Sequence, residues 1–367
     1  MTNNEVRAMV QTGPRAVELR TLPRPEVGDD EALVRVEACG ICGTDIGMFD
    51  DGHGAEFPLI RGHEPVGTIE VLGASYARRT GLAMGDRVAV DPFIRCGTCR
   101  YCLAGRGELC QSGGAARPNN SYAMIPLSEG SGLWGGFATH LMATNQTVLY
   151  PVPSHVPAKQ AALFNALGAG VKWTLDAGGV RQGSTVVVLG GGQRGLSSAV
   201  AALEAGATFV AVTGLGRDRH KLALAKDLGV HAAVNVEEES IVDVVARQLG
   251  SGVDAVIDTT PGATQSILDA IQLVRVGGTI VSGGLKRRPV EAFPIDDLTR
   301  KEISLRGVLG TGADHYRRAI DMIANSRRPL ARMQTHTVPL AQLEYGIGLL
   351  AGSVPGEEPI AVVIDTR

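Results

Sequence analysis

The chain has 367 residues, of which 44% are hydrophobic, and its formal net charge at pH 7 is −3. This length favours about two domains with sizeable cores, and the balanced charge, without a long basic run, argues against nucleic acid as a partner. The sequence shows neither a signal peptide nor an apolar run long enough to cross a bilayer, so we expect no membrane partner.

The N-terminal part has a β-rich pattern. Short strand-like runs at 31–40, 65–73 and 86–92 are separated by Gly, Asp and Pro. Two long irregular stretches, 44–62 and 92–135, interrupt these runs. The pattern therefore predicts a domain of short strands joined by long loops.

Near Pro157 the pattern changes to helical stretches that alternate with short apolar strands. The predicted strands lie at 184–192, 209–214, 253–260 and 278–284, and the predicted helices at 196–206, 218–229 and 264–278. This alternation is typical of βαβ units around a parallel sheet. It fades after about residue 309, so we predict a central domain, 158–309, enclosed by a discontinuous one made of 1–157 and 310–367.

Four cysteines in the stretch 92–112 predict a metal site. Cys96, Cys99, Cys102 and Cys110 have the spacing C-x2-C-x2-C-x7-C, which can close a tetrahedral thiolate cage around a structural Zn²⁺. Their loop has little apolar surface, so a metal would supply the folding energy that a core cannot. A disulfide pair and an iron–sulfur site are the alternatives, although the last spacing exceeds the gap of about three residues in the bacterial ferredoxin run.

All six cysteines fall in two clusters, 39/42 and 96–110. Both clusters are better explained as metal-related thiols than as a disulfide framework, so we expect a reducing, cytoplasmic location.

A glycine-rich turn predicts dinucleotide binding. Gly190, Gly192 and Gly195 fit G-x-G-x-x-G, with Gln193 and Arg194 between the last two glycines. The turn follows an apolar strand and precedes a helix, which is the context that a bound pyrophosphate requires. The helix N-terminus would then face the phosphates with free N–H groups.

The end of the second predicted strand favours NADP over NAD. An acidic residue is expected there to hold the ribose of NAD, but the sequence has Gly214. Arg217 or Arg219 could pair with a 2′-phosphate. Asp218 is the expected N-cap of the following helix.

Further fragments complete a family resemblance. Cys42-Gly43-Thr44-Asp45, Gly62-His63-Glu64 and the region of Asn165, together with the cysteine cluster and the glycine turn, resemble the zinc-dependent medium-chain alcohol dehydrogenase family over nearly the whole chain. The resemblance implies an α/β fold, with a GroES-like β-barrel catalytic domain around a Rossmann domain. It also implies NAD(P)-linked oxidation of alcohols or reduction of carbonyls, small-molecule substrates, and a homodimer or homotetramer.

The resemblance also implies roles for individual residues. Cys42 and His63 would be ligands of a catalytic zinc, and Glu64 would support the site or exchange onto the metal. Asp45 would fix the His63 tautomer, and Thr44 would relay the substrate proton.

Two positions depart from the family pattern. The third protein ligand falls on Asn165, whose neutral amide is a poorer zinc ligand than a thiolate or carboxylate. Gly47 stands where many relatives have a histidine that passes the proton to solvent. His53 is nearby in sequence and could replace it, but the pattern favours a solvated loop histidine at that position. Two alternatives therefore stay open: a reductase of C=C or carbonyl groups without catalytic zinc, and a nucleotide-binding protein without turnover.

Overall fold

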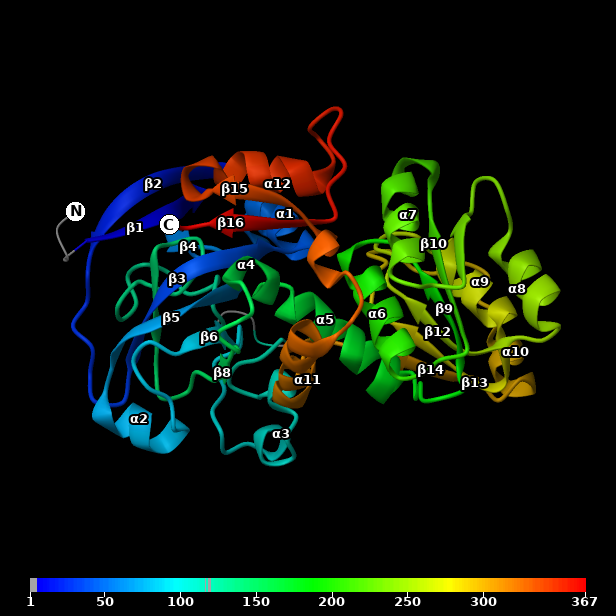
Figure 1. Cartoon of the computed structure of the whole chain (residues 1–367), viewed down its shortest axis with the longest axis horizontal. Helices are drawn as coiled ribbons and strands as arrows, with labels where there is room; N and C mark the ends of the chain where they lie inside the picture. Colours follow the sequence, from blue (N-terminus) through cyan, green and yellow to red (C-terminus); the bar gives the residue numbers. More distant parts are fainter. Residues whose placement is uncertain (1–4, 116, 118–119) are drawn as a thin grey trace. The chain divides into compact units, whose positions relative to one another are not determined.

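The computed structural model describes residues 5–115, 117 and 120–367 (Figure 1). Unit 1 comprises Met1–Asn165, Gly312–Asn325 and Gln334–Arg367, and unit 2 comprises Ala166–Thr311 and Ser326–Met333. The sequence pattern assigned everything beyond 310 to the first domain. The structure instead packs Ser326–Met333 with unit 2, because Arg328 donates hydrogen bonds to Glu204 and to the Leu228 carbonyl.

Unit 1 is built on two sheets (Figure 1). A three-stranded sheet has the order β2-β1-β4, with β1 at Glu5–Gly13, β2 at Ala16–Pro23 and β4 at Leu59–Ile60. The seven-stranded sheet has the order β15-β16-β3-β5-β6-β8, and β7 pairs with β3. Its strands are β3 Ala32–Ile41, β5 Glu64–Leu72, β6 Arg87–Val90, β7 His140–Ala143, β8 Leu149–Pro151, β15 Gln334–Pro339 and β16 Ala361–Asp365.

The helices of unit 1 lie between these strands or follow them. They are α1 Gly43–Asp51, α2 Ala74–Thr80, α3 Arg100–Leu103, α4 Ala158–Ala161, α11 Ala313–Asn325 and α12 Leu343–Ala351. Helix α5, Phe164–Val171, runs across the boundary between the two units. Among the described residues, no helix is both long and apolar enough to span a bilayer.

Helix α1 is held by an apolar cluster under its inner face. Ile46 and Phe49 pack against buried side chains that include Ile41 of β3 and Leu343 of α12. Burial of such side chains contributes about 1.5–3 kcal/mol each. This packing fixes α1 and the two residues before it relative to the sheet.

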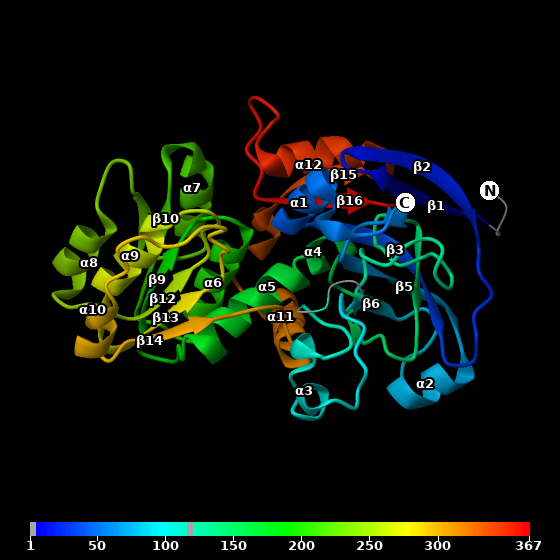
Figure 2. The same cartoon turned by 180° about the vertical axis from the view of Figure 1, so that it is seen from behind.

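Unit 2 contains a six-stranded, all-parallel sheet of order β11-β10-β9-β12-β13-β14 (Figure 2). The strands are β9 Thr185–Leu189, β10 Phe209–Gly214, β11 Ala232–Asn235, β12 Val253–Asp258, β13 Val274–Ser282 and β14 Ser304–Gly307. In chain order this is 3-2-1-4-5-6, the order of the doubly wound dinucleotide-binding fold. The predicted parallel α/β domain is confirmed.

The helices of unit 2 connect consecutive strands. They are α6 Gln193–Glu204, α7 Arg219–Asp227, α8 Ile241–Leu249, α9 Gln265–Leu273 and α10 Ile295–Arg300. The helix predicted over 264–278 is too long, because α9 ends at Leu273 and β13 starts at Val274. Two valines and two glycines follow, and these residues favour extended or turning backbone over helix.

Candidate active site and cofactor turn

The first turn of α1 presents the thiol of Cys42. Asp45 accepts a hydrogen bond from the Cys42 N–H at 2.8 Å, and its own N–H donates to the Cys42 carbonyl at 2.9 Å. These two bonds close the turn between β3 and α1. Both residues are buried, Asp45 at 2% and Cys42 at 4% exposed.

His63 lies against this turn. Its Nδ1 is 3.4 Å from the second carboxylate oxygen of Asp45, and its Nε2 is 3.4 Å from the Thr44 hydroxyl. Burial alone would lower the pKa of His63, but the charge and hydrogen bond of Asp45 raise it well above the usual value. A carboxylate on Nδ1 leaves Nε2 directed at the Thr44 side, as a metal-binding histidine requires.

Glu64 comes next in the chain and begins β5, where it is fully buried. It pairs with Gly40 on β3, and a Cβ on Gly40 would lie 2.4 Å from a Glu64 carboxylate oxygen. The glycine is therefore needed to seat the carboxylate. The donor atoms of Cys42, His63 and Glu64 all lie within 4.8 Å of one another.

This donor set fits a zinc ion. Thiolate, imidazole and carboxylate are the ligand types that Zn²⁺ takes in proteins, at about 2.0–2.3 Å from the metal. Two buried carboxylates, Asp45 and Glu64, lie beside the Cys42 thiol, and burying such groups together is costly without a cation.

Asn165 is also buried, at 4% exposed, and lies at the start of α5. Its Nδ2 donates to the hydroxyl of Tyr316 at 3.3 Å. With the nitrogen end of the amide on Tyr316, the oxygen end faces away from that hydroxyl and is the end that could bind a cation.

His53 lies over Gly47 on the outer face of α1. Its imidazole Nε2 is 2.7 Å from the point that a Cβ on Gly47 would occupy. The His53 backbone is in the left-handed region, at φ 49°, and its N–H donates to Asp51 at 2.8 Å. The side chain is 36% exposed, so it contacts both the helix and solvent.

The four cysteines of the loop lie close together in the structure, with their sulfurs all within 4.8 Å of one another. The Cys96 sulfur lies 4.0 Å from that of Cys102 and 3.5 Å from that of Cys110, and Cys99 lies 4.0 Å from Cys110. A tetrahedral Zn–S₄ site with bonds of about 2.3 Å places its sulfurs about 3.8 Å apart. All six cysteines of the chain are free thiols, and none of these spacings approaches a disulfide bond.

The local backbone favours thiolates at this cluster. The N–H groups of Thr98 and Cys99 lower the pKa of Cys96 to about 5. Burial raises the pKa of Cys102 to about 12, a cost that a bound cation would offset. The donor chemistry therefore fits a structural zinc.

In unit 2, the glycine turn joins β9 to α6. Gly190 has φ 101°, and a Cβ on Gly195 would lie 1.8 Å from the Gly190 carbonyl oxygen, so both positions require glycine. A Cβ on Gly192 would meet no atom within 4 Å, which leaves open space at the start of α6. That space fits a pyrophosphate.

The turn lies where β9 and β12 diverge in strand order, the expected ligand crevice of this fold. The Thr259 N–H and hydroxyl both donate to the Leu189 carbonyl at 2.9 Å. Gln193 and Arg194 begin α6, and the Arg194 guanidinium lies 5.5 Å from the ring centroid of Trp173. Thr259 and Trp173 were not predicted as site residues, because neither belongs to the glycine motif.

The structure places the other predicted cofactor residues at the end of β10. Gly214 is the last residue of that strand, Arg217 is exposed, and Arg219 pairs with Glu238 at 2.6 Å. Asp218, the residue before α7, accepts hydrogen bonds from the Leu215 N–H and the Lys221 ammonium.

Two family models match the chain, the alcohol dehydrogenase GroES-like domain over residues 28–154 and the zinc-binding dehydrogenase domain over residues 195–325. A probable alcohol dehydrogenase of Mycobacterium tuberculosis is 39% identical over 362 residues, covering 98% of both chains. An L-threonine 3-dehydrogenase of Chelativorans sp. is 31% identical and covers 96% of this chain and 98% of its own.

A zinc-binding dehydrogenase from Sinorhizobium meliloti 1021, whose crystal structure holds NADP, has a TM-score of 0.85 and 29% identity, covering 99% of this chain and 100% of its own. These similarities confirm the GroES-like and Rossmann domains. They also confirm zinc and a nicotinamide dinucleotide as cofactors at the level of the family. The chain belongs to the zinc-dependent medium-chain alcohol dehydrogenase family and is an oxidoreductase that acts on CH–OH groups.

Proposed function

We propose that this chain is a zinc-dependent, NAD(P)-linked alcohol dehydrogenase or carbonyl reductase acting on a small-molecule substrate. The observation that carries this proposal is the convergence of Cys42, His63 and Glu64 beside the Thr44 hydroxyl. Zinc held by these side chains would stabilise negative charge on the substrate oxygen, while the nicotinamide exchanges a hydride with the substrate carbon.

The residues around this cluster have separate tasks. Asp45 holds His63 in the tautomer that directs Nε2 to the metal, and it closes the turn that presents Cys42. Thr44, 3.4 Å from His63 Nε2, exchanges the proton of the substrate hydroxyl. Asn165 supplies at most a weak neutral ligand through its amide oxygen.

His53 completes the proton path. It lies over Gly47, and Gly47 and Thr44 are three residues apart on the same face of α1. The imidazole is partly exposed, and imidazole is the side chain best suited to exchange protons with water near neutral pH. His53 therefore transfers the proton between Thr44 and solvent.

At the glycine turn, Gly190, Gly192 and Gly195 bind the pyrophosphate of the dinucleotide with the N-terminus of α6. Gln193 and Arg194 flank it, and the positive charge of Arg194 favours the phosphates. Cys96, Cys99, Cys102 and Cys110 hold the second, structural zinc.

We also propose a cytoplasmic homodimer or homotetramer. The six free thiols are consistent with a reducing compartment. Strand β14 is an edge of its sheet, all four of its residues are exposed, and Leu305 within it is 41% exposed. In the described part of the chain β14 pairs only with β13, so its free edge can pair with a second copy.

The test combines metal analysis with turnover. The protein purified without chelators is assayed for NAD(P)-dependent oxidation of a panel of primary and secondary alcohols, and for reduction of the matching carbonyls. We expect turnover and up to two zincs per chain, and we expect Cys42→Ser to lose one zinc and the activity. Cys39→Ser, three residues earlier on β3, is the matched control and should retain both.

The outcomes separate the alternatives. One zinc per chain with reduction of an activated C=C bond would support the reductase that works without catalytic zinc. Absence of turnover with every alcohol and carbonyl, despite dinucleotide binding, would support the alternative of a nucleotide-binding protein without turnover.

A further inference from the structure

The turn after β10 carries carboxylates that the sequence motif did not place there. The Gly216 N–H donates to a Glu237 carboxylate oxygen at 2.7 Å, and the Leu215 N–H donates to Asp218 at 3.2 Å. Gly216 follows the glycine motif by about 20 residues, where this fold contacts the adenosine ribose. Two consecutive backbone donors of this turn are thus already bound to carboxylates of the chain itself.

Glu237 reaches this turn from the neighbouring strand. Strands β10 and β11 are parallel, with Gly214 opposite Asn235, so both end at the same edge of the sheet. The Val236 N–H donates to the Gly214 carbonyl at 3.0 Å, which fixes the segment after β11. A Cβ on Gly216 would lie 2.9 Å from the Glu237 carboxylate, so the absence of a side chain at 216 lets the carboxylate approach.

The structure also shows what occupies the space beside Gly214. A Cβ there would lie 3.1 Å from the Asp218 Cβ and 3.2 Å from Leu222. Partial burial alone would raise the pKa of Asp218, but the hydrogen bond and charge of Lys221 keep it below the usual value. Asp218 is therefore a carboxylate at neutral pH, and the strand end is not free of negative charge.

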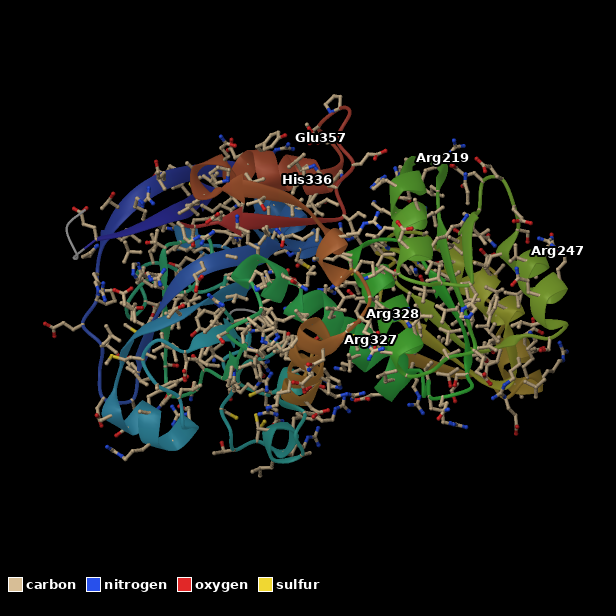
Figure 3. The ribbon with its side chains drawn as sticks, in the orientation of Figure 1. Arg219, Arg247, Arg327, Arg328, His336 and Glu357 are labelled. Atoms are coloured by element: carbon tan, nitrogen blue, oxygen red, sulfur yellow. The ribbon has the colours of Figure 1, made fainter. Side chains whose placement is uncertain are left out.

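The cations in this region already face carboxylates. Arg219, labelled in Figure 3 on the first turn of α7, pairs with Glu238, and Lys221 pairs with Asp218 at 2.7 Å. The Arg219–Glu238 pair is exposed and contributes little stability, but it opposes the charge that would attract a 2′-phosphate. Arg217 is exposed, and its charge acts on Asp218.

We propose that Glu237 determines cofactor specificity and that the chain prefers NAD to NADP. Its carboxylate accepts hydrogen bonds from the adenosine ribose hydroxyls and repels a 2′-phosphate through like charge. The preference for NADP inferred from the lack of a carboxylate at position 214 is thereby reversed. The inference rests on the proposed dinucleotide-binding function.

The test measures dissociation constants of NADH and NADPH by nucleotide fluorescence, for the parent, Glu237→Gln and Glu239→Gln. We expect the parent to bind NADH at least about tenfold more tightly than NADPH, and Glu237→Gln to reduce that ratio by about tenfold. Glu239→Gln, at an exposed carboxylate two residues further along that pairs with Arg247, should change the ratio by less than about threefold.

The other outcomes contradict either the specificity inference alone or the proposed function as well. A parent that prefers NADPH, or a ratio that Glu237→Gln leaves unchanged, overturns the specificity inference and leaves the proposed function standing. A parent that binds neither dinucleotide overturns the proposed function and the inference with it.

Discussion

The imidazole of His53 occupies the space that a side chain on Gly47 would fill, with its Nε2 2.7 Å from the position of a Cβ on that glycine. A histidine six residues further along the chain therefore covers the same face of α1. The Asp51 carboxylate, which accepts the His53 N–H, and the Phe57 ring, which lies 2.6 Å from a Cβ placed on Gly52, hold this loop in shape.

His53→Ala should lower kcat for alcohol oxidation at neutral pH by about tenfold, a modest part of the 10²–10⁴-fold that general acid–base catalysis supplies. Zinc content should not change, because His53 is not among the proposed ligands. Steady-state kinetics with and without added imidazole provide the check, and imidazole should restore part of the rate. His155→Ala, at an exposed loop histidine, is the control. A kcat within twofold of the parent and insensitive to imidazole contradicts the assignment.

Asn165→Cys should raise zinc occupancy of the catalytic site towards two zincs per chain, because a thiolate binds Zn²⁺ far better than an amide. Metal analysis after gel filtration measures this directly. Tyr316→Phe removes the hydroxyl that Asn165 contacts and should leave occupancy unchanged. If the parent already holds two zincs, the weak-ligand account of Asn165 is wrong.

Cys99→Ser should remove one zinc per chain and lower the melting temperature by about 5 °C or more, since metal binding supplies much of the folding energy of such a loop. Metal analysis and thermal unfolding followed by circular dichroism are the measurements. Cys39→Ser, which alters a thiol outside the cluster, should retain the full zinc content. Retention of both zincs in Cys99→Ser would show that these cysteines hold no metal.

Arg61→Met should destabilise unit 1 by about 2–4 kcal/mol, because it leaves buried acceptors without their donor. Arg61 is 4% exposed and donates to Gln11 at 2.6 Å, to the Ala123 carbonyl at 2.8 Å and to the Gly52 carbonyl at 3.1 Å. Burial lowers its pKa to about 10.

The midpoint of urea unfolding measures this effect. Arg15→Met, which breaks an ion pair with Asp50 at a side chain 72% exposed, should change stability by no more than about 0.5 kcal/mol. Equal urea midpoints for Arg61→Met and Arg15→Met would contradict the structural role assigned to Arg61.

Features that are local in sequence were predictable from the residues alone. The glycine turn needs one strand, three glycines and one helix in succession, and the structure has β9 before it and α6 after it. The four cysteines lie within one short loop, so their spacing already indicated that they meet. The meeting of Cys42 with His63 depends on β3 and β5, and only the family resemblance pointed to it.

Contacts between distant segments were beyond the sequence. Glu237 reaches Gly216 across 21 residues because two parallel strands end together, and no motif encodes that pairing. Tyr316 meets Asn165 across 151 residues. The end of α9 was missed because the apolar residues Val274 and Val276 at the start of β13 continue the apolar pattern of the helix, and short apolar runs of helix and strand are hard to distinguish.

The short segment Ser326–Met333 has a consequence for synthesis of the protein. Unit 2 is contiguous up to Thr311, yet Arg328, labelled in Figure 3, and Arg332, which pairs with Asp227 at 2.8 Å, tie this later segment to it. A nascent chain on the ribosome therefore cannot complete the nucleotide-binding unit until it has also made α11, a helix of the other unit. A fragment that stops at Thr311 would lack Ser326–Met333, so Glu204 and the Leu228 carbonyl would lose the hydrogen bonds that Arg328 donates.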